Sequence, residues 1–445
     1  MRRQFRSVLN WLKRPSVLLA VIGLVLPNIA FVALNLAGVG VPPRTLPIIL
    51  YMLAAASIRF LPSPLVVIFF IAALAFDVIY CATQLFGLTL TEALFALRFI
   101  NELDILQSTL YVVLIVLLSS VFGSAFYLLV RFARQLKGAR WTLMLALGLL
   151  TIPADILLNT PKDSNFWLRI GGTDRPFESA ITKSGFIQLV EQPNGRPMLV
   201  MIVEAMGHFD DPAMQKLLED AIRSHGIEGR YDVTTGTNSF IGGTTSAEMR
   251  EFCQTRDSYM DHLDKPRPDC LPFHLEKMGY HTVAYHGFSQ GMFERGKWWP
   301  QIGFTERHFG EDLFHPGERL CGDVFVGVCD PKLVKDIAAR LKAATEKEFA
   351  YLLTFNTHVP VIGSQGYNHL DCQHHDPRLP EREVCFMADA WIELLQTVAA
   401  TYADPAQPPA EILIVGDHAP PLWYRKARDL FTPGEVTWFR LSPKN

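Results

Sequence analysis

The sequence predicts a membrane protein in two parts: an N-terminal bundle of five transmembrane helices, followed by an extracytoplasmic α/β sandwich with a mainly parallel sheet. Three observations predict this fold class. Apolar residues make up 49% of the 445 residues and concentrate in the first third of the chain, and six of the seven cysteines lie in the remainder. In that remainder, short apolar runs alternate with helical patterns. The formal net charge of −3, with no basic run that carries interleaved aromatic residues, predicts no nucleic-acid partner.

Five apolar stretches before residue 160 approach the length of about 20 residues that a helix needs to cross a bilayer. They are Ser16–Gly38, Thr45–Leu61, Pro64–Leu85, Gln107–Val130 and Trp141–Leu158. Pro27 falls inside the first stretch, where a bundle tolerates a kink. A cleaved signal peptide followed by buried soluble helices is the alternative, but a signal peptide accounts for the first stretch only. We therefore expect a transmembrane domain over residues 1–160.

Basic residues predict the orientation of these spans, because Lys- and Arg-rich loops stay in the cytoplasm. The loop Arg131–Arg140 carries four basic residues and no acid, and the N-terminus is also basic, with Arg2, Arg3, Arg6, Lys13 and Arg14. Five spans with both points inside place the rest of the chain on the outer side. We expect a linker at the membrane surface over 161–195 and an outer domain over 196–445.

The cysteines test this orientation independently. Cys81 lies in the third predicted span, whereas the other six fall into three locally spaced pairs, Cys253/Cys270, Cys321/Cys329 and Cys372/Cys385. An even set of this kind suggests disulfides in an oxidising compartment, although six cysteines allow many connectivities. A zinc-finger-like cluster is the alternative, and no Cys-x-x-Cys spacing supports it.

The outer domain carries short apolar runs and amphipathic helical patterns in alternation. Candidate strands are Met198–Val203, Thr282–Tyr285, Ala350–Phe355 and Ile412–Val415. Candidate helices include Pro212–Ser224, Thr244–Phe252, Lys332–Thr345 and Val384–Thr401. This alternation is typical of a mainly parallel sheet between helices, and in such sheets a site forms at the carboxyl ends of the strands.

Each candidate strand runs into an acid or an imidazole. The first ends at Glu204, the last at Asp417 and His418, and the other two at His286 and His358. A single histidine at a strand end is more often a structural residue than a ligand. Four strands that deliver such groups to one sheet edge indicate a site, and these side chains suit zinc or manganese.

The segment Gly242-Gly243-Thr244-Thr245-Ser246 places hydroxyl groups at the start of a predicted helix. A helix N-terminus favours an anion and can hold a phosphate, so a threonine here is a candidate nucleophile. The alternative is an ordinary N-cap followed by the acidic Glu248, and the motif by itself favours that interpretation.

Together these motifs resemble the membrane branch of the alkaline phosphatase superfamily. That branch includes lipoteichoic acid synthases, lipid A phosphoethanolamine transferases and the phosphoglycerol transferases of periplasmic glucans. The resemblance covers the five spans and the whole outer domain. It rests on motifs in this order: Val203-Glu204, Gly243-Thr244, Tyr285-His286-Gly287, Phe293-Glu294-Arg295, Gly303-Phe304, Asn356-Thr357-His358-Val359-Pro360 and Gly416-Asp417-His418-Ala419-Pro420-Pro421.

The resemblance implies that Glu204, Thr244, Asp417 and His418 hold one divalent metal, Zn or Mn. It also implies that Thr244 is the nucleophile, although Thr245 remains an alternative.

The resemblance further implies that His358 is a phosphate ligand or the proton donor to the leaving oxygen, and that His286 and Arg295 hold phosphate oxygens. If the donor is a lipid, Trp298 and Trp299 are placed to meet it or the membrane interface, since Trp favours the headgroup level. Packing of both side chains in the core is the equally weighted alternative.

Two departures from the family pattern affect the assignment. Ala205 stands where the family usually has Ser, so a local hydrogen bond is expected to be missing. The segment Ala419–Trp423 replaces the Gly-Glu-Ser continuation of phosphoethanolamine transferases and removes candidate ligands of a second metal. A sulfatase is disfavoured because no Cys-x-Pro-x-Arg motif is present.

The function that the resemblance implies is transfer of a phospholipid head group, phosphoglycerol or phosphoethanolamine, through a phosphothreonine intermediate. The implied donor is a membrane phospholipid and the acceptor a glycan or lipid-linked sugar. The implied location is the bacterial inner (cytoplasmic) membrane, with the catalytic domain in the periplasm or outside. The alternatives are a metal-dependent phosphodiesterase or phosphatase with water as acceptor, and a non-catalytic glycan-binding membrane protein.

Overall fold

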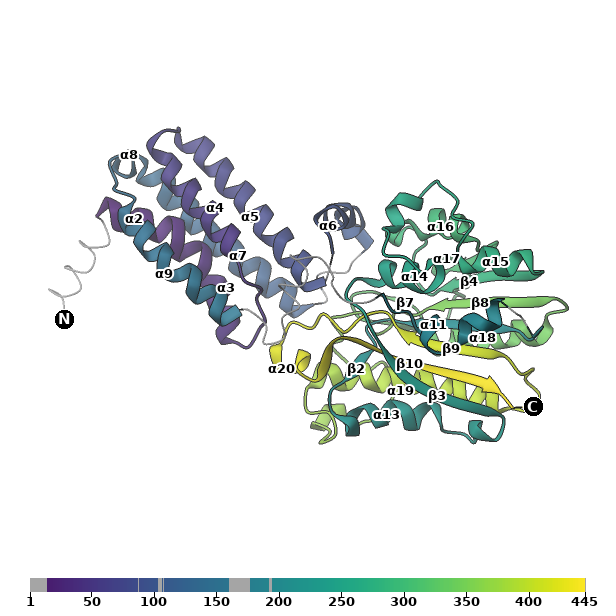
Figure 1. Ribbon diagram of the computed structural model, residues 1–445. Helices are drawn as coiled ribbons and strands as arrows, with labels where there is room; N and C mark the ends of the chain where they lie inside the picture. The colour runs from purple at the N-terminus through teal and green to yellow at the C-terminus, as the bar shows by residue number, and fades with distance from the viewer. Residues whose placement is uncertain are drawn as a thin grey trace. The chain divides into compact units, whose positions relative to one another are not determined.

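The computed structural model describes residues 14–86, 88–102, 106, 108–159, 177–191 and 194–444 (Figure 1). These residues form two compact units. The helical unit comprises the described residues of Met1–Phe95, Thr109–Gly172 and Trp423–Arg425, and the sheet unit comprises those of Ala96–Ser108, Thr173–Leu422 and Lys426–Asn445. Most of the predicted linker, like most of the basic N-terminus, lies outside the described residues, so both stay predictions.

The helical unit is built from apolar helices. Its helices are α2 (Pro15–Ala20), η1 (Val21–Val25), α3 (Leu26–Leu36), α4 (Thr45–Ala56), η2 (Ser57–Arg59), α5 (Ser63–Phe86), α6 (Leu90–Ala96), α7 (Thr109–Arg131), α8 (Ala133–Leu136) and α9 (Thr142–Asn159). Four of the five predicted spans are confirmed as helices that are long and apolar enough to cross a membrane. The second, Thr45–Arg59, is a shorter apolar helix. A fifth helix that meets the length and hydropathy criteria, Arg382–Ala403, belongs to the sheet unit and is mostly buried there.

The surface of the helical unit is apolar, which is the reverse of a soluble bundle. On α9, Leu149, Leu150, Leu157 and Leu158 are 63–82% exposed. The free energy of exposed apolar side chains is lower when lipid, rather than water, surrounds them. The apolar helices therefore indicate a membrane protein.

Pro27 changes the geometry of the first span, as its position predicts. A π-helical turn, Val21–Val25, interrupts the span directly before Pro27. Proline has no N–H and its ring clashes with the carbonyl group four residues earlier, so a wider turn relieves the contact.

One ion pair lies buried among the helices. The Arg44 guanidinium donates to both carboxylate oxygens of Asp77 and to Asn28 Oδ1, and Tyr51 donates to Asp77 at 3.0 Å. Arg44 and Asp77 are 1% and 0% exposed. Every charge in the cluster has a hydrogen-bonding partner, so the pair fixes how these helices pack rather than leaving a free ion site.

The sheet unit contains an eight-stranded sheet. Its strands are β1 (Met198–Val203), β2 (Gly207–Phe209), β3 (Tyr231–Ser239), β4 (Tyr280–His286), β5 (Glu306–Phe309), β8 (Lys347–Leu353), β9 (Glu411–Gly416) and β10 (Phe431–Pro443). The order is β2-β10-β9-β1-β8-β4-β5, and β3 also pairs with β10. Strands β9, β1, β8, β4 and β5 are parallel, whereas β10 runs antiparallel to β9 and carries β2 and β3. The predicted mainly parallel sheet is confirmed.

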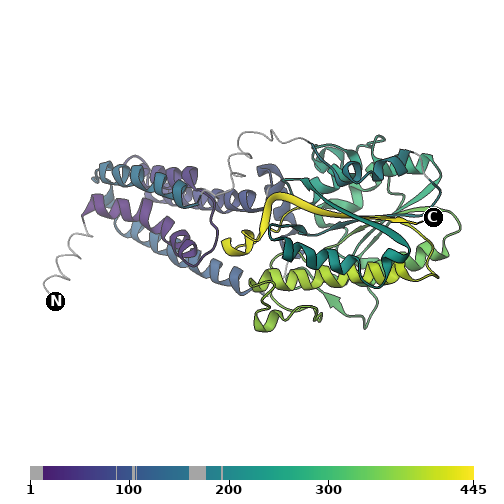
Figure 2. The same cartoon turned by 60° about the horizontal axis from the view of Figure 1, so that its bottom comes forward.

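Helices cover both faces of this sheet (Figures 1 and 2). Every residue of β1 and β9 is buried, as expected for parallel strands between two helix layers. One group of helices packs together as α13 (Pro212–Ile222), α18 (Asp330–Ala343) and α19 (Arg382–Ala403). A second packs as α12 (Phe186–Glu191), α14 (Thr244–Cys253) and α15 (Leu271–Lys277). The remaining described elements are η3 (Leu97–Glu102), α11 (Ala180–Lys183), η5 (Ile227–Gly229), η6 (Tyr259–His262), η7 (Met292–Glu294), α16 (Arg295–Trp298), η8 (Pro300–Ile302), α17 (Gly310–Leu313), β6 (Leu320–Cys321), β7 (Gly327–Val328), η9 (Cys372–His374) and α20 (Arg425–Arg428).

One predicted strand ends earlier than expected. Strand β8 stops at Leu353 instead of continuing to Phe355. The N–H groups of Phe355 and Asn356 leave the sheet and donate to the buried Asp330 carboxylate. The Asp330 side chain, at the start of α18, therefore accepts the N–H groups that a neighbouring strand would otherwise accept. This ends β8 and turns the chain towards His358.

The three predicted disulfides are confirmed. They join Cys253 to Cys270, Cys321 to Cys329 and Cys372 to Cys385, and Cys81 is free. Each closes a short loop, so local spacing was a sound guide to pairing.

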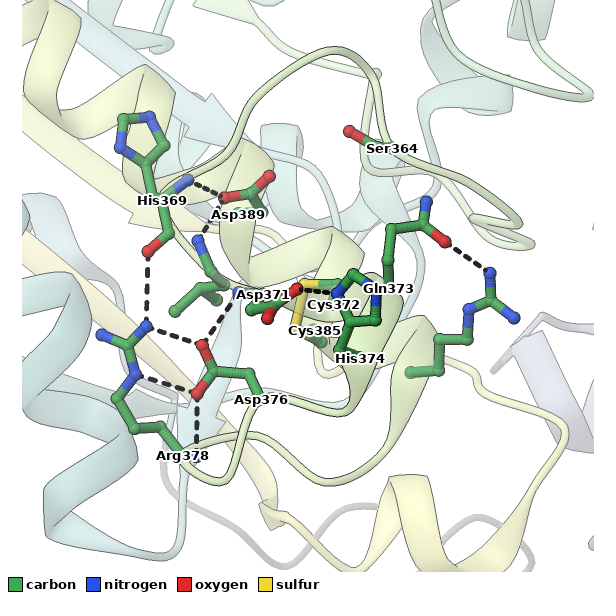
Figure 3. The surroundings of a disulfide bond; sticks show 12 residues. Ser364, His369, Asp371, Cys372, Gln373, His374, Asp376, Arg378, Cys385 and Asp389 are labelled. Atoms are coloured by element: carbon green, nitrogen blue, oxygen red, sulfur yellow. Dashed lines mark hydrogen bonds and ion pairs between the residues drawn. A yellow bond between two sulfur atoms is a disulfide. The ribbon is translucent and has the colours of Figure 1, made fainter.

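Figure 3 shows how the third disulfide ties a loop to α19. On this loop, the Asp376 carboxylate accepts hydrogen bonds from the Arg378 guanidinium and from the N–H of Asp371. Asp389, on α19, accepts the N–H of His369. Two buried carboxylates and one disulfide therefore hold a segment that forms almost no regular secondary structure.

Candidate active site

The parallel strands bring the predicted ligands to one sheet edge. In the register of β1 and β9, Val203 lies opposite Gly416, so Glu204 and Asp417 leave neighbouring strands side by side. One donor atom from each of Glu204, Asp417 and His418 lies within 4.8 Å of the others. The sequence therefore predicted a set of residues that the fold does bring together.

Thr244 completes this group from another element. It is the first residue of α14, and its Oγ1 donates to Asp417 Oδ2 at 2.8 Å. The same oxygen lies 3.3 Å from Glu204 Oε2 and 3.5 Å from His418 Nε2. Thr244 is half-buried, whereas Thr245 is buried and turned into the protein. Of the two candidate nucleophiles, Thr244 is the one whose hydroxyl meets the acidic cluster.

Backbone hydrogen bonds orient the two carboxylates. Asp417 Oδ1 accepts the N–H of Ala205 at 2.7 Å and that of His418 at 2.6 Å, which leaves Oδ2 for Thr244. Ala205 has φ 57°, a left-handed conformation that residues with a Cβ rarely adopt. The turn after Glu204 therefore uses the backbone of residue 205, and its side chain is not needed to hold Asp417.

The donor set fits a divalent cation. His418 Nδ1 lies 3.1 Å from the carbonyl oxygen of Ala419, which can only accept, so Nδ1 carries the proton and Nε2 offers its lone pair to the cluster. Burial, and next the negative charge of Asp417, raise the pKa of Glu204 well above its ordinary value. Two buried carboxylates so close together call for a positive charge between them. These residues therefore suit a hard or borderline cation such as zinc or manganese.

Helix α14 is held by charged side chains that sequence reasoning did not assign. Arg250 donates to the carbonyl oxygens of Gly416 and Asp417 at 3.1 and 3.2 Å, and pairs with Glu251. Gly416 itself packs closely, since a Cβ there would lie 1.8 Å from the carbonyl oxygen of Met206. The planar guanidinium of Arg250 thus joins the helix that carries Thr244 to the turn that carries Asp417, through hydrogen bonds to two carbonyl oxygens of that turn.

A buried ion pair positions the predicted phosphate ligand Arg295. Its guanidinium donates to Glu248 Oε2 at 3.2 Å and to the carbonyl oxygen of Met292. Glu248, on the turn of α14 that follows Thr244, also accepts from Trp299 Nε1 at 2.8 Å and from the Tyr351 hydroxyl at 3.0 Å. The sequence pattern also allows Glu248 to be part of an ordinary N-cap; in the structure its carboxylate orients Arg295.

The expectation that Trp298 and Trp299 meet the membrane interface or the donor is wrong. Both side chains are fully buried, and the Trp298 indole donates to the carbonyl oxygen of Phe293. The core alternative holds because each indole N–H has an internal acceptor and each ring has aromatic neighbours.

The two remaining predicted site histidines are neutral. Burial lowers the pKa of His286 to about 3, and Arg295 adds to the effect. Burial also lowers the pKa of His358 to about 4. Their Nδ1 atoms lie 3.1 and 2.9 Å from the carbonyl oxygens of Leu353 and Val359, so in each ring Nδ1 carries the proton and Nε2 is an acceptor. In this state His358 suits the acceptance of a proton better than its donation.

Comparison with known proteins finds structural similarity only. No protein-family model and no curated protein matches the chain. The chain is similar to the lipoteichoic acid synthase LtaP from Listeria monocytogenes, at 14% identity and a TM-score of 0.41, over 56% of this chain and 65% of that one. It is also similar to the Streptococcus pyogenes phosphoglycerol transferase GacH, at 15% identity and a TM-score of 0.40, over 61% and 76% of the two chains. A third match is the C-terminal periplasmic domain of EcEptC from Escherichia coli in complex with Zn, at 13% identity and a TM-score of 0.35, over 56% and 73%. The chain thus spans slightly less than two thirds of the first of these proteins.

The arrangement can carry out one kind of chemistry in particular. A hydroxyl group at a helix N-terminus, a cation site beside it and a buried guanidinium nearby together suit attack on a phosphoryl group. Among the described residues, sequence reasoning found the groups with reactive or ligating atoms. It missed Arg250, Glu251 and Tyr351, which act through hydrogen bonds from positions that carry no motif.

Proposed function

We propose that this protein is a membrane phosphotransferase that moves a phospholipid head group, phosphoglycerol or phosphoethanolamine, onto a glycan or lipid-linked sugar. The observation that carries the proposal is the contact of Thr244 Oγ1 with Asp417 Oδ2 at 2.8 Å, at the N-terminus of α14 and beside a cation site. The apolar helices of the same chain support a donor that resides in the membrane.

In the first step, Thr244 Oγ1 attacks phosphorus and passes its proton to Asp417 Oδ2. A divalent cation held by Glu204, Asp417 and His418 would favour ionisation of the threonine hydroxyl and balance the negative charge of the site. Arg295 stabilises the charge that develops on the phosphoryl oxygens. The new bond joins phosphorus to Thr244, the bond from phosphorus to the lipid oxygen breaks, and the leaving oxygen takes a proton from water to give diacylglycerol.

In the second step, an acceptor hydroxyl attacks the phosphothreonine. His358, neutral and with Nε2 as an acceptor, takes the proton of the incoming hydroxyl group. Phosphorus forms a bond to the acceptor oxygen, the bond to Thr244 breaks, and Asp417 returns its proton to Thr244 Oγ1. His358 then releases the proton of the acceptor to water. A bound phosphate anion raises the pKa of a nearby imidazole, so the same residue can return the proton in the reverse direction.

The test uses the full-length protein in vesicles of phosphatidylethanolamine and phosphatidylglycerol. Intact-mass measurement should show a covalent adduct equal to one transferred head group, and mass spectrometry of the lipids should show diacylglycerol. Thr244→Ala should abolish both, whereas Thr245→Ala should leave the adduct in place. Adduct formation by the Thr244→Ala protein would reject the covalent mechanism, and free head group in place of a glycan product would assign water as the acceptor.

A further inference from the structure

A hairpin closed by a disulfide covers one side of the active site. Strands β6 and β7 pair through Leu320 and Val328, and the Cys321–Cys329 bond closes the segment between them. Phe325, inside this hairpin, places its ring 3.9 Å from the His358 imidazole, measured between centroids. The hairpin is therefore part of the wall of the site and not a remote surface feature.

A second contact fixes the hairpin to the loop that carries His358. The Asp323 carboxylate accepts the N–H of Ile362 at 2.8 Å. The chain between His358 and Ile362 and the chain between Asp323 and Val326 consequently form one surface, with Phe325 as its inner side.

The outer side of this surface is unusually apolar. Phe314, Leu320, Val326 and Ile362 are 41%, 39%, 41% and 49% exposed, and we refer to these four side chains as the apolar lip. In the part of the sheet unit described from residue 177 to residue 422, Phe177 is the one other large apolar side chain that is as exposed. Leu320 and Val326 belong to the hairpin, Ile362 to the loop bonded to it, and α17, which ends just before Phe314, packs against β7. A soluble surface scatters such side chains, whereas four of them on adjoining elements mark a contact with an apolar partner.

We propose that the apolar lip contacts the acyl-bearing part of a membrane phospholipid and sets the preference of the site for a lipid donor. This inference rests on the proposed function. The group that leaves such a donor is diacylglycerol, and its acyl chains need an apolar surface beside the reacting phosphate. The lip provides that surface on the hairpin whose Phe325 ring lies against the His358 imidazole, whereas a polar glycan would leave these side chains in contact with water.

The first experiment compares two donors on the full-length protein in vesicles of phosphatidylethanolamine and phosphatidylglycerol. In the double variant Val326→Ser with Ile362→Ser, kcat/KM for diacylglycerol release should fall by about tenfold or more. Cleavage of the small soluble diester bis(p-nitrophenyl) phosphate should change less than about twofold. Phe177→Ser is the matched control, because Phe177 is also 39% exposed but lies outside the lip.

A second readout does not depend on catalysis. In a Cys81→Ser background, Ile362→Cys carries an environment-sensitive fluorophore, and lipids with a spin label near the headgroup act as quenchers. Quenching should be strong at residue 362 and weak for Asp220→Cys, an exposed position on α13 whose side chain is 59% accessible.

The outcomes separate the two proposals. Quenching without any diacylglycerol release would support the lip and reject the proposed function. Diacylglycerol release that the double variant does not change would reject the lip and leave the proposed function standing. Equal loss on both donors would assign the lip a structural role, and a loss confined to the acceptor step would assign it to the glycan; either result overturns the inference.

Discussion

Replacement of Glu248 tests whether the site depends on a buried ion pair. The Glu248 and Arg295 side chains are 0% and 3% exposed, and Glu248 accepts three hydrogen bonds. Burial raises the pKa of Glu248, whereas Arg295, Trp299 and Tyr351 lower it. If the pair is ionised, Glu248→Gln leaves a buried, uncompensated guanidinium, which costs about 3–5 kcal/mol of stability.

That loss corresponds to a fall in melting temperature of about 6–20 °C for a domain of this size. Arg295→Met alone should cost a similar amount, because it leaves the carboxylate without its cation. The double variant, Glu248→Gln with Arg295→Met, should recover most of the stability, since glutamine still accepts from Trp299 and Tyr351. It should not recover activity. All three variants should lose about 10²- to 10³-fold in rate, because each removes either Arg295 or the carboxylate that orients it.

The assay is tryptophan-fluorescence melting of the full-length protein in detergent, combined with the head-group transfer rate. A Glu248→Gln protein that melts within about 2 °C of the wild type would show that Glu248 is protonated and that no ion pair exists. A double variant less stable than either single variant would show that the two residues do not act as a pair.

Three further predictions concern the nucleophile, the cation and a buried acid. Thr244→Ser should keep a measurable phosphoenzyme in the trapping experiment, whereas Thr244→Ala should form none. In the wild type, chelator treatment should lower the melting temperature and added Zn or Mn should restore it. Arg250→Lys should weaken metal affinity about 10- to 100-fold in a titration, because lysine cannot hold two carbonyl groups. Burial raises the pKa of Asp330 to about 7 from 3.8, so its contribution favours folding at low pH and is lost as pH rises towards 7. Asp330→Asn should therefore gain up to about 4 kcal/mol relative to the wild type between pH 4 and pH 7 in denaturant melts, and a constant difference would contradict this pKa.

The parts of the fold that the sequence predicted are those with a strong periodic or compositional signal. Strand β1 matches its expected bounds, and β9 differs by one residue at each end, because fully buried parallel strands read as continuous apolar runs. The antiparallel strands β3 and β10 were not predicted. Strand β3 reads Tyr-Asp-Val-Thr-Thr-Gly-Thr-Asn-Ser and is only partly buried, so no apolar run marks it.

The residues of the candidate site also fall into those that the sequence could predict and those that it could not. Residues with distinctive chemistry at strand ends, such as Glu204 and Asp417, could be predicted because the topology of a parallel sheet fixes where strand ends meet. Arg250 could not, because its role depends on a three-dimensional contact with two backbone carbonyl groups. The orientation of Trp299 could not be predicted either, since an indole suits a core and a membrane interface equally until its hydrogen-bond partner is known.

Helix α14 connects the three parts of the candidate site: the nucleophile, the phosphate ligand and the cation site. Its first residue supplies the hydroxyl group, Glu248 fixes Arg295, and Arg250 fixes the turn of Asp417. The helix ends at Cys253, which a disulfide holds to Cys270. Three charged side chains of this ten-residue helix, Glu248, Arg250 and Glu251, are buried. Burial of a charge costs stability unless the charge is paired and hydrogen-bonded, and here the bonds that pair these charges also hold the nucleophile, the phosphate ligand and the Asp417 turn in place.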